Sequence, residues 1–236
     1  FKSVGGSSES YFWLNNTGSL LNQTICGLFT GIPNYIMVPI AAKMVKKWGA
    51  RATSIIAGLF GFFAYMTLFF VGFHPFGQTF KDHYIFNLIW VIFGLTICGL
   101  PNKILNVSGQ IVTAEALDYM EWKHGLRNEA LVTTVQGYFG KLATSVTGWL
   151  SGMVLTWINY VPLTDSLGNA VPQTDPTMLN GIWAVFCILP ALARGLYGVS
   201  FIIYPIHGDL QQQMIVELAE KRAQRLAEQE AKDHQA

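Results

Sequence analysis

Five long apolar segments constrain the fold of this chain more than any other feature of its sequence. A helix that crosses the hydrocarbon core of a bilayer needs about 20 mostly apolar residues. Five segments meet this length: residues 20–42, 53–73, 84–105, 131–158 and 178–204. The third is predicted to continue as a helix to about Ala114. The chain is therefore predicted to be an all-α transmembrane protein.

Composition and cysteine placement agree with a membrane protein. Hydrophobic residues make up 51% of the chain and charged residues only 12%, whereas soluble domains average about 25% charged. Residues 1–10 lack the basic and apolar regions of a signal peptide, and the chain does not begin with Met, so we expect a piece of a longer protein. The cysteines lie in apolar segments and are interpreted as packing residues: Cys26, Cys98 and Cys187.

Lysine and arginine are distributed unevenly between the two ends of the predicted spans. Loops on the cytoplasmic side of a membrane protein carry an excess of these residues. One side holds two of them, Lys2 and Lys81. The other side holds ten: Lys43, Lys46, Lys47, Arg51, Lys123, Arg127, Lys221, Arg222, Arg225 and Lys232. The asymmetry predicts an outside N-terminus and a cytoplasmic C-terminus.

The chain is predicted to divide into a membrane part and a tail. Residues 1–208 would form the transmembrane bundle, and residues 209–236 a cytoplasmic amphipathic tail. The tail is rich in Glu, Gln, Ala and Arg, and its apolar residues recur at near-helical spacing: Leu210, Met214, Leu218 and Leu226. A surface helix is therefore expected, and a solvated tail that anchors weakly is the alternative.

Two helix faces in the predicted bundle are polar or small rather than apolar. The face at the start of the bundle combines Asn16, Gln23, Gly27, Thr30, Gly31 and Asn34. The face of the fourth span combines Gly137, Gly140, Lys141, Thr144, Gly148, Ser151 and Gly152. Polar groups in hydrocarbon need partners or water, so both faces are predicted to contact helices or a cavity. Interhelical hydrogen bonding alone is the alternative for the first face.

Three cations lie within the predicted spans: Lys103, Lys141 and Arg194. A charged side chain in the bilayer costs about 2.5–3.5 kcal/mol even on lenient insertion scales. No carboxylate of the chain is predicted to lie deep enough to pair with them. Either water reaches these cations, or acids arrive from a partner.

A short, charge-dense segment separates the third and fourth spans. Its acidic, aromatic and basic residues, with the glutamate that follows, are Glu115, Asp118, Tyr119, Met120, Glu121, Trp122, Lys123, Arg127 and Glu129. Gln136 then precedes Lys141 by five residues, and the pair Tyr204-Pro205 comes before the tail.

These residues resemble the glycoside–pentoside–hexuronide:cation symporters, the melibiose-permease-like branch of the major facilitator superfamily. That family carries Asp-x-x-Asp-Tyr-Gly-Glu-[Trp/Tyr]-Lys-x-x-x-Arg-x-Glu after helix ten, and a glutamine five residues before a lysine in helix eleven. The five spans then look like helices eight to twelve, the C-terminal part of a major-facilitator-type helical bundle. The chain departs from the family at Glu115, which replaces Asp, and at Met120, which replaces Gly. Asn106 stands where melibiose permease has a Trp against the sugar.

The resemblance implies a cation-coupled secondary active symporter for a sugar, glycoside or hexuronide. The substrate would bind at mid-membrane, between this bundle and a missing N-terminal helical bundle. Substrate-binding or coupling residues would be Lys141, Gln136 and Asn106, with Lys103 added for its depth in the span although it is not a family feature. A cytoplasmic gate would consist of Glu115, Asp118, Glu121 and Arg127.

The resemblance also implies the partners and the location of the protein. No cofactor is expected, and the coupling cation, Na⁺ or H⁺, would bind mainly on the missing N-terminal half. The expected partners are the lipid bilayer, a small sugar and the missing bundle, with no nucleic acid. The protein is expected to be a multi-pass protein of a bacterial inner membrane.

Two other functions remain open. A lysolipid transporter of the same superfamily branch would suit the extra cations. A structural or regulatory membrane module without transport is the other alternative. An enzyme is not expected, because the sequence shows no Ser-His-Asp, metal-ligand or phosphate-loop arrangement, and its five histidines lie in loops or the tail.

Overall fold

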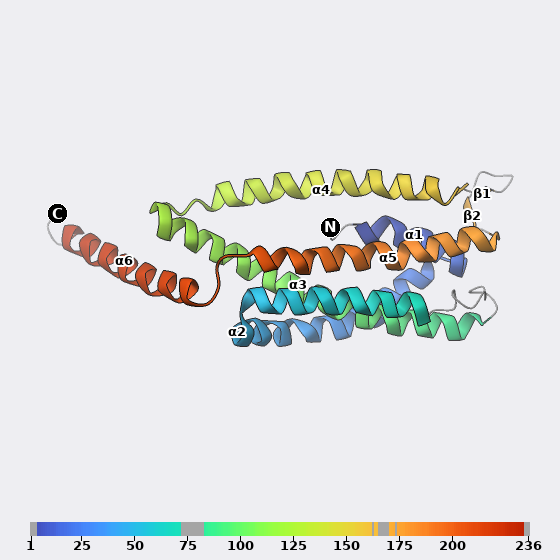
Figure 1. Cartoon of the computed structure of the whole chain (residues 1–236), viewed down its shortest axis with the longest axis horizontal. Helices are drawn as coiled ribbons and strands as arrows, with labels where there is room; N and C mark the ends of the chain where they lie inside the picture. Colours follow the sequence, from blue (N-terminus) through green and yellow to red (C-terminus); the bar gives the residue numbers. More distant parts are fainter. Residues whose placement is uncertain (1–3, 72–82, 162, 165–169, 173, 234–236) are drawn as a thin grey trace.

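The computed structural model describes residues 4–71, 83–161, 163–164, 170–172 and 174–233, which are mostly helical (Figure 1). The helices are α1 (Val4–Thr17), α2 (Leu21–Val71), α3 (Tyr84–His124), α4 (Glu129–Trp157), α5 (Pro176–Ser200), the 3-10 turn η2 (Phe201–Ile203) and α6 (Asp209–Asp233). Between α4 and α5, the two-residue strands β1 (Leu163–Thr164) and β2 (Ala170–Val171) pair antiparallel. Lys2 and Lys81, used in the charge asymmetry, lie outside the described residues.

Three helical segments in the described part of the chain are long and apolar enough to cross a membrane: Leu21–Val71, Tyr84–His124 and Pro176–Ile203. The first contains two of the predicted spans. It leaves the helical conformation at Gly49 (φ 79, ψ 161), a backbone state that glycine adopts without a Cβ clash. Its two halves then run side by side (Figure 1). The predicted fold class, an all-α transmembrane bundle, is confirmed.

Helix α1 was not predicted from the sequence, and it corrects the expected start of the bundle. Glycine and serine are poor helix formers and dominate its first turns. Its stability comes instead from Phe12 and Trp13, which are fully buried. The ring of Phe12 stacks on Phe186 of α5, with the ring centroids 4.4 Å apart. The chain turns at Gly18 (φ 75), so Asn16 belongs to α1 and not to the predicted polar face of the first span.

Helices α2, α3 and α5 pack closely where glycines face a neighbour. A Cβ on Gly58 would lie 2.5 Å from the Cα of Gly198, so the backbones of α2 and α5 are in contact. A Cβ on Gly94 of α3 would lie 2.4 Å from Leu68 of α2. Small residues of this kind let transmembrane helices approach closely. The three helices therefore form the rigid core that positions the polar side chains described below.

Helix α4 lies apart from this core, alongside the bundle (Figure 1). It has 29 residues and is long enough to span a membrane, but it is not among the three described segments that are also apolar enough to do so. Most of its side chains are exposed. A Cβ added to any of its glycines would meet no neighbouring atom within 4 Å: Gly137, Gly140, Gly148 and Gly152. Its small-residue face is therefore open in the described part of the chain.

Candidate functional site

Arg194 is stabilised inside the bundle by an aromatic ring and a backbone carbonyl. Its guanidinium carbon lies 4.4 Å from the centroid of the Tyr65 ring. Its Nη1 donates to the carbonyl oxygen of Pro190 at 3.0 Å. A desolvated cation–π contact is worth about 2 kcal/mol. The sequence predicted water or a partner's acid for this cation, and it did not foresee the ring.

Lys103 has a similar partner, whereas Lys141 does not. The Nζ of Lys103 lies 5.2 Å from the ring centroid of Tyr35, on the first half of α2. Lys141 is exposed on α4, and no carboxylate of the described residues lies within ion-pair distance of it. Of the three predicted membrane cations, Lys141 is thus the one whose charge faces open space.

A cavity of about 320 Å³ lies among α1, α2, α3 and α5. Its polar lining includes Glu9, Thr30, Asn102 and Arg194. In the sequence, Glu9 lies outside the five predicted spans. Because α1 folds against α5, this carboxylate reaches the bundle interior, which corrects the expectation that no acid lies near the cations. Its Oε1 accepts a hydrogen bond from Trp13 Nε1 at 3.5 Å. The cavity therefore offers an acid, a cation, an amide and a hydroxyl to a polar solute.

The other predicted binding residues lie on α3 and α4. Asn106 is half-buried on α3. Gln136 of α4 donates from Nε2 to Oγ1 of Thr113 on α3 at 2.9 Å. This hydrogen bond ties α4 to α3 one and a half turns before Lys141, so it holds the lysine in register with the bundle.

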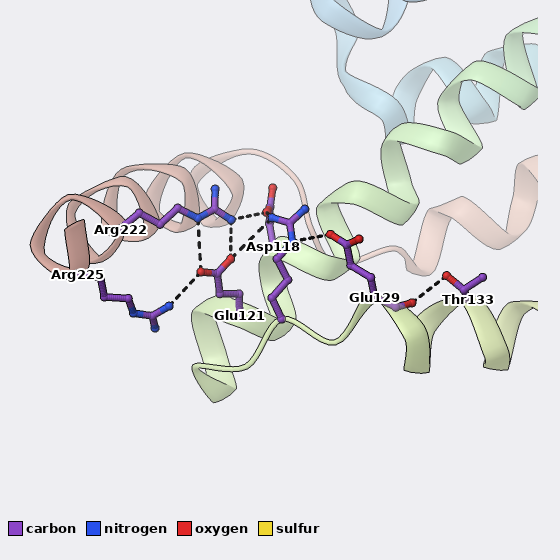
Figure 2. Close-up of polar contacts among 7 residues, drawn as sticks. Asp118, Glu121, Glu129, Thr133, Arg222 and Arg225 are labelled. Atoms are coloured by element: carbon purple, nitrogen blue, oxygen red, sulfur yellow. Dashed lines mark hydrogen bonds and ion pairs between the residues drawn. The ribbon is translucent and has the colours of Figure 1, made fainter. Parts of the chain in front are cut away.

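The charged residues at the end of α3 form a cluster with α6, as Figure 2 shows. We call it the charge cluster; its members are Asp118, Glu121, Arg127, Arg222 and Arg225. Arg222 Nη2 lies 2.8 Å from Asp118 Oδ1 and 2.5 Å from Glu121 Oε2. Arg127 Nη1 lies 3.2 Å from Asp118 Oδ1, and Arg225 Nη1 lies 3.3 Å from Glu121 Oε1. Three of the four predicted gate residues thus meet here, with two arginines that were not predicted.

Glu121 is the centre of this cluster. Its side chain is 6% exposed. The hydrogen bonds from Arg222 hold the pKa of the Glu121 carboxyl below its usual 4.5, and the charges of Arg222, Arg127 and Arg225 act in the same direction against the effect of burial. Helix α3 has 41 residues, about 60 Å at ~1.5 Å per residue, twice the ~30 Å of the hydrocarbon core. Glu121, in its last turn, therefore lies beyond the membrane.

Glu115, the fourth predicted gate residue, has separate partners. It accepts hydrogen bonds from the Tyr204 hydroxyl at 2.8 Å and from Gln211 Nε2 at 2.7 Å. It therefore ties α3 to the segment after η2, through Tyr204, and to the first turn of α6, through Gln211.

Helix α6 docks on α3, which sequence reasoning missed. Met214 and Leu218 are buried at 1% and 3% exposure. Glu217 Oε2 accepts a hydrogen bond from Trp122 Nε1 at 2.7 Å. The signal was present in the sequence, because Met214, Leu218 and Arg222 are spaced by four and share one face of a helix. That face matches the apolar and acidic end of α3.

Comparison with known proteins places this chain among membrane transporters. The sequence profile of the family described as "MFS/sugar transport protein" matches residues 4–208. The uncharacterized symporter YjmB of Bacillus subtilis is 29% identical over 214 residues, which is 89% of this chain and 42% of the relative. The isoprimeverose transporter of Lactiplantibacillus pentosus is 28% identical over 120 residues, 50% of this chain and 23% of the relative.

A protein of Escherichia coli named as a proposed sulfoquinovose importer is 35% identical over 89 residues, 35% of this chain and 18% of the relative. The chain thus spans less than half the length of each of these relatives. These relatives are named as a symporter, a transporter and an importer rather than as enzymes, in agreement with the prediction from the sequence. The profile match covers nearly all of the helical bundle, and it shows that this chain, an integral multi-pass membrane protein, belongs to the MFS/sugar transport protein family.

Proposed function

We propose that this chain is the C-terminal part of a cation-coupled symporter for a sugar, glycoside or hexuronide. The observation that carries the proposal is the open face of α4, where Lys141 stands among glycines that meet no atom of the described chain. Such a face has room for a substrate or for another helical bundle. The names of the relatives, which include a symporter and an isoprimeverose transporter, support it.

In this proposal Lys141 acts in the central binding site. Its ammonium offers three hydrogen-bond donors to sugar oxygens or to acids on the remaining part of the transporter. It also responds electrostatically when a coupling cation, Na⁺ or H⁺, enters nearby. Gln136, Asn106 and Lys103 would line the same site. The coupling cation would bind mainly on the part of the transporter that precedes this chain.

Glu115, Asp118, Glu121 and Arg127 are proposed to act in a cytoplasmic gate, in a bacterial inner membrane with the C-terminus inside. The three arginines of the charge cluster share two carboxylates, Asp118 and Glu121, so a rearrangement of these ion pairs would open the gate. Helix α6 would hold these residues in one arrangement while the gate is closed. The family match favours a sugar over the lysolipid alternative.

The test uses the full-length protein in membrane vesicles with an imposed Na⁺ or H⁺ gradient. Lys141→Val removes the charge and the donors, whereas Lys141→Arg keeps the charge and changes its geometry. Both variants should reach the membrane and lose gradient-driven sugar accumulation. Lys43→Gln, which removes a lysine outside the site, should accumulate sugar normally. Normal accumulation by Lys141→Val would show that the lysine has no role in the central site.

A further inference from the structure

A basic pocket opens at the end of the bundle where α2 turns at Gly49 and where η2 leads into α6. Its volume is about 960 Å³, and Lys46, Lys47, Arg51 and His207 all line it. The first residues of the second half of α2 line it as well, and the start of a helix carries a partial positive charge. The pocket therefore concentrates positive charge at one point of the surface.

Arg51 is held rigidly at the wall of this pocket. Its Nε donates to the carbonyl oxygen of Phe201 at 3.2 Å, and its Nη2 to that of Ile202 at 2.6 Å. Its Nη1 contacts Nε2 of His207. The guanidinium thus joins the turn of α2 to the end of α5 while its charge remains without a carboxylate partner among the described residues.

The two lysines of the pocket are exposed and have no carboxylate within ion-pair distance in the described part of the chain. Glu115 also lines the pocket. However, this single carboxylate does not balance the three cations Lys46, Lys47 and Arg51. The pocket therefore has an excess of cations that lack an anion.

The apolar surroundings of the pocket indicate where that anion comes from. Ile202, which lines the pocket, is 53% exposed, and the adjacent Ile203 is 85% exposed. Trp48, also in the lining, is 47% exposed, and tryptophan is enriched at the boundary between membrane and water. A ligand here would meet cations at one end and aliphatic side chains at the other. This combination fits an amphiphile better than a free ion.

We propose that this pocket binds the phosphate group of an acidic phospholipid, with its acyl chains along the end of α5. Basic pockets between transmembrane helices bind anionic headgroups in this way. The pocket lies away from the open face of α4. Glu115 of the proposed gate also lines it, but lipid binding by the basic residues does not depend on the proposed symport.

The test measures binding of phosphatidylglycerol and phosphatidylcholine with identical acyl chains to the purified full-length protein by native mass spectrometry. Wild-type protein should retain phosphatidylglycerol in preference to phosphatidylcholine. Because each lysine near an anionic surface contributes roughly fivefold, the double variant Lys46→Gln/Lys47→Gln should lose more than about tenfold in affinity for it. Lys46→Arg/Lys47→Arg should keep the preference, since it keeps both charges.

Lys43→Gln is the matched control, because Lys43 is exposed on the same segment but does not line the pocket. It should bind phosphatidylglycerol like wild type. An equal loss of affinity in Lys43→Gln, or no loss of affinity in Lys46→Gln/Lys47→Gln, would show that this pocket is not the binding site. Tighter binding of inorganic phosphate than of phosphatidylglycerol would overturn the lipid as its ligand.

Discussion

At the scale of single residues, aromatic rings stabilise two of the membrane cations, for which carboxylate partners were expected. Tyr65 and Tyr35 each lie within cation–π distance of a cation that the sequence leaves unpaired. The faces of their π-systems are negative, and they attract a cation at a smaller desolvation cost than an ion pair requires. A lone basic residue in an apolar span is therefore compatible with a stable bundle, even without an acid.

The contact between Arg194 and Tyr65 can be tested by comparing two substitutions of the tyrosine. Tyr65→Leu removes the ring and should lower the stability of the purified protein by about 2–4 kcal/mol, from the lost cation–π contact and the lost packing. Tyr65→Phe keeps the ring and should cost much less. Thermal unfolding in detergent gives both values. Equal losses in the two variants would mean that the ring itself contributes nothing to holding Arg194.

At the scale of helices, the glycines of the chain divide into two groups with different surroundings. Those of α3 and α5, with Gly58 and Gly61 of α2, would place a Cβ against neighbouring atoms, whereas those of α4 would meet none within 4 Å. Because Gly58 faces the backbone of Gly198, Gly58→Ala should destabilise the protein by about 1–3 kcal/mol. Gly137→Ala should leave stability unchanged or raise it by up to about 1 kcal/mol, since alanine favours a helix.

Thermal unfolding of the two alanine variants, together with transport by the full-length protein, separates packing from function. A stable Gly137→Ala variant that transports slowly would indicate that the open face of α4 is used by a substrate or another bundle. A Gly58→Ala variant as stable as wild type would contradict the close contact between α2 and α5.

The docking of α6 should depend on pH through Glu121. Its folded-state pKa is lowered from 4.5, chiefly by the hydrogen bonds from Arg222. A lowered carboxyl pKa contributes stability that is present above the unfolded value and is lost as the pH falls through the folded value. Docking should therefore be constant from neutral pH to about pH 5 and weaken at lower pH.

Spin labels at Lys123→Cys and Gln224→Cys would report the distance between α3 and α6. Both positions are exposed, so a spin label can be attached at each of them. The distance should lengthen only in acid. The variant Arg222→Gln should already show a longer distance at neutral pH and a smaller change in acid. A shorter distance in acid would contradict the assigned role of Glu121.

At the scale of the whole molecule, the sequence predicted the features that depend on the local pattern of residues. The apolar spans of α2, α3 and α5 follow from length and composition, and the turn at Gly49 follows from a glycine among basic residues. Helix α1 could not be predicted, because it depends on the burial of Phe12 and Trp13 against α5. The ring that contacts Arg194 lies on α2 and two of the arginines that pair with Glu121 lie on α6, so spacing along one segment does not reveal these partners.

The orientation of the molecule gives the last prediction, because the structure and the charge asymmetry constrain it separately. Lys46 and Gln211 line the same pocket, so the turn of α2 and the start of α6 must lie on one side of the membrane. The excess of basic residues predicts that this side is cytoplasmic. In a background without the three native cysteines, an impermeant thiol reagent added to intact cells should label Thr174→Cys. It should label Lys46→Cys and Gln224→Cys only after permeabilisation. Different accessibility at the last two positions would contradict the placement of α6 at the same end of the bundle as the turn of α2, whereas external labelling at both would reverse the orientation and leave the fold intact.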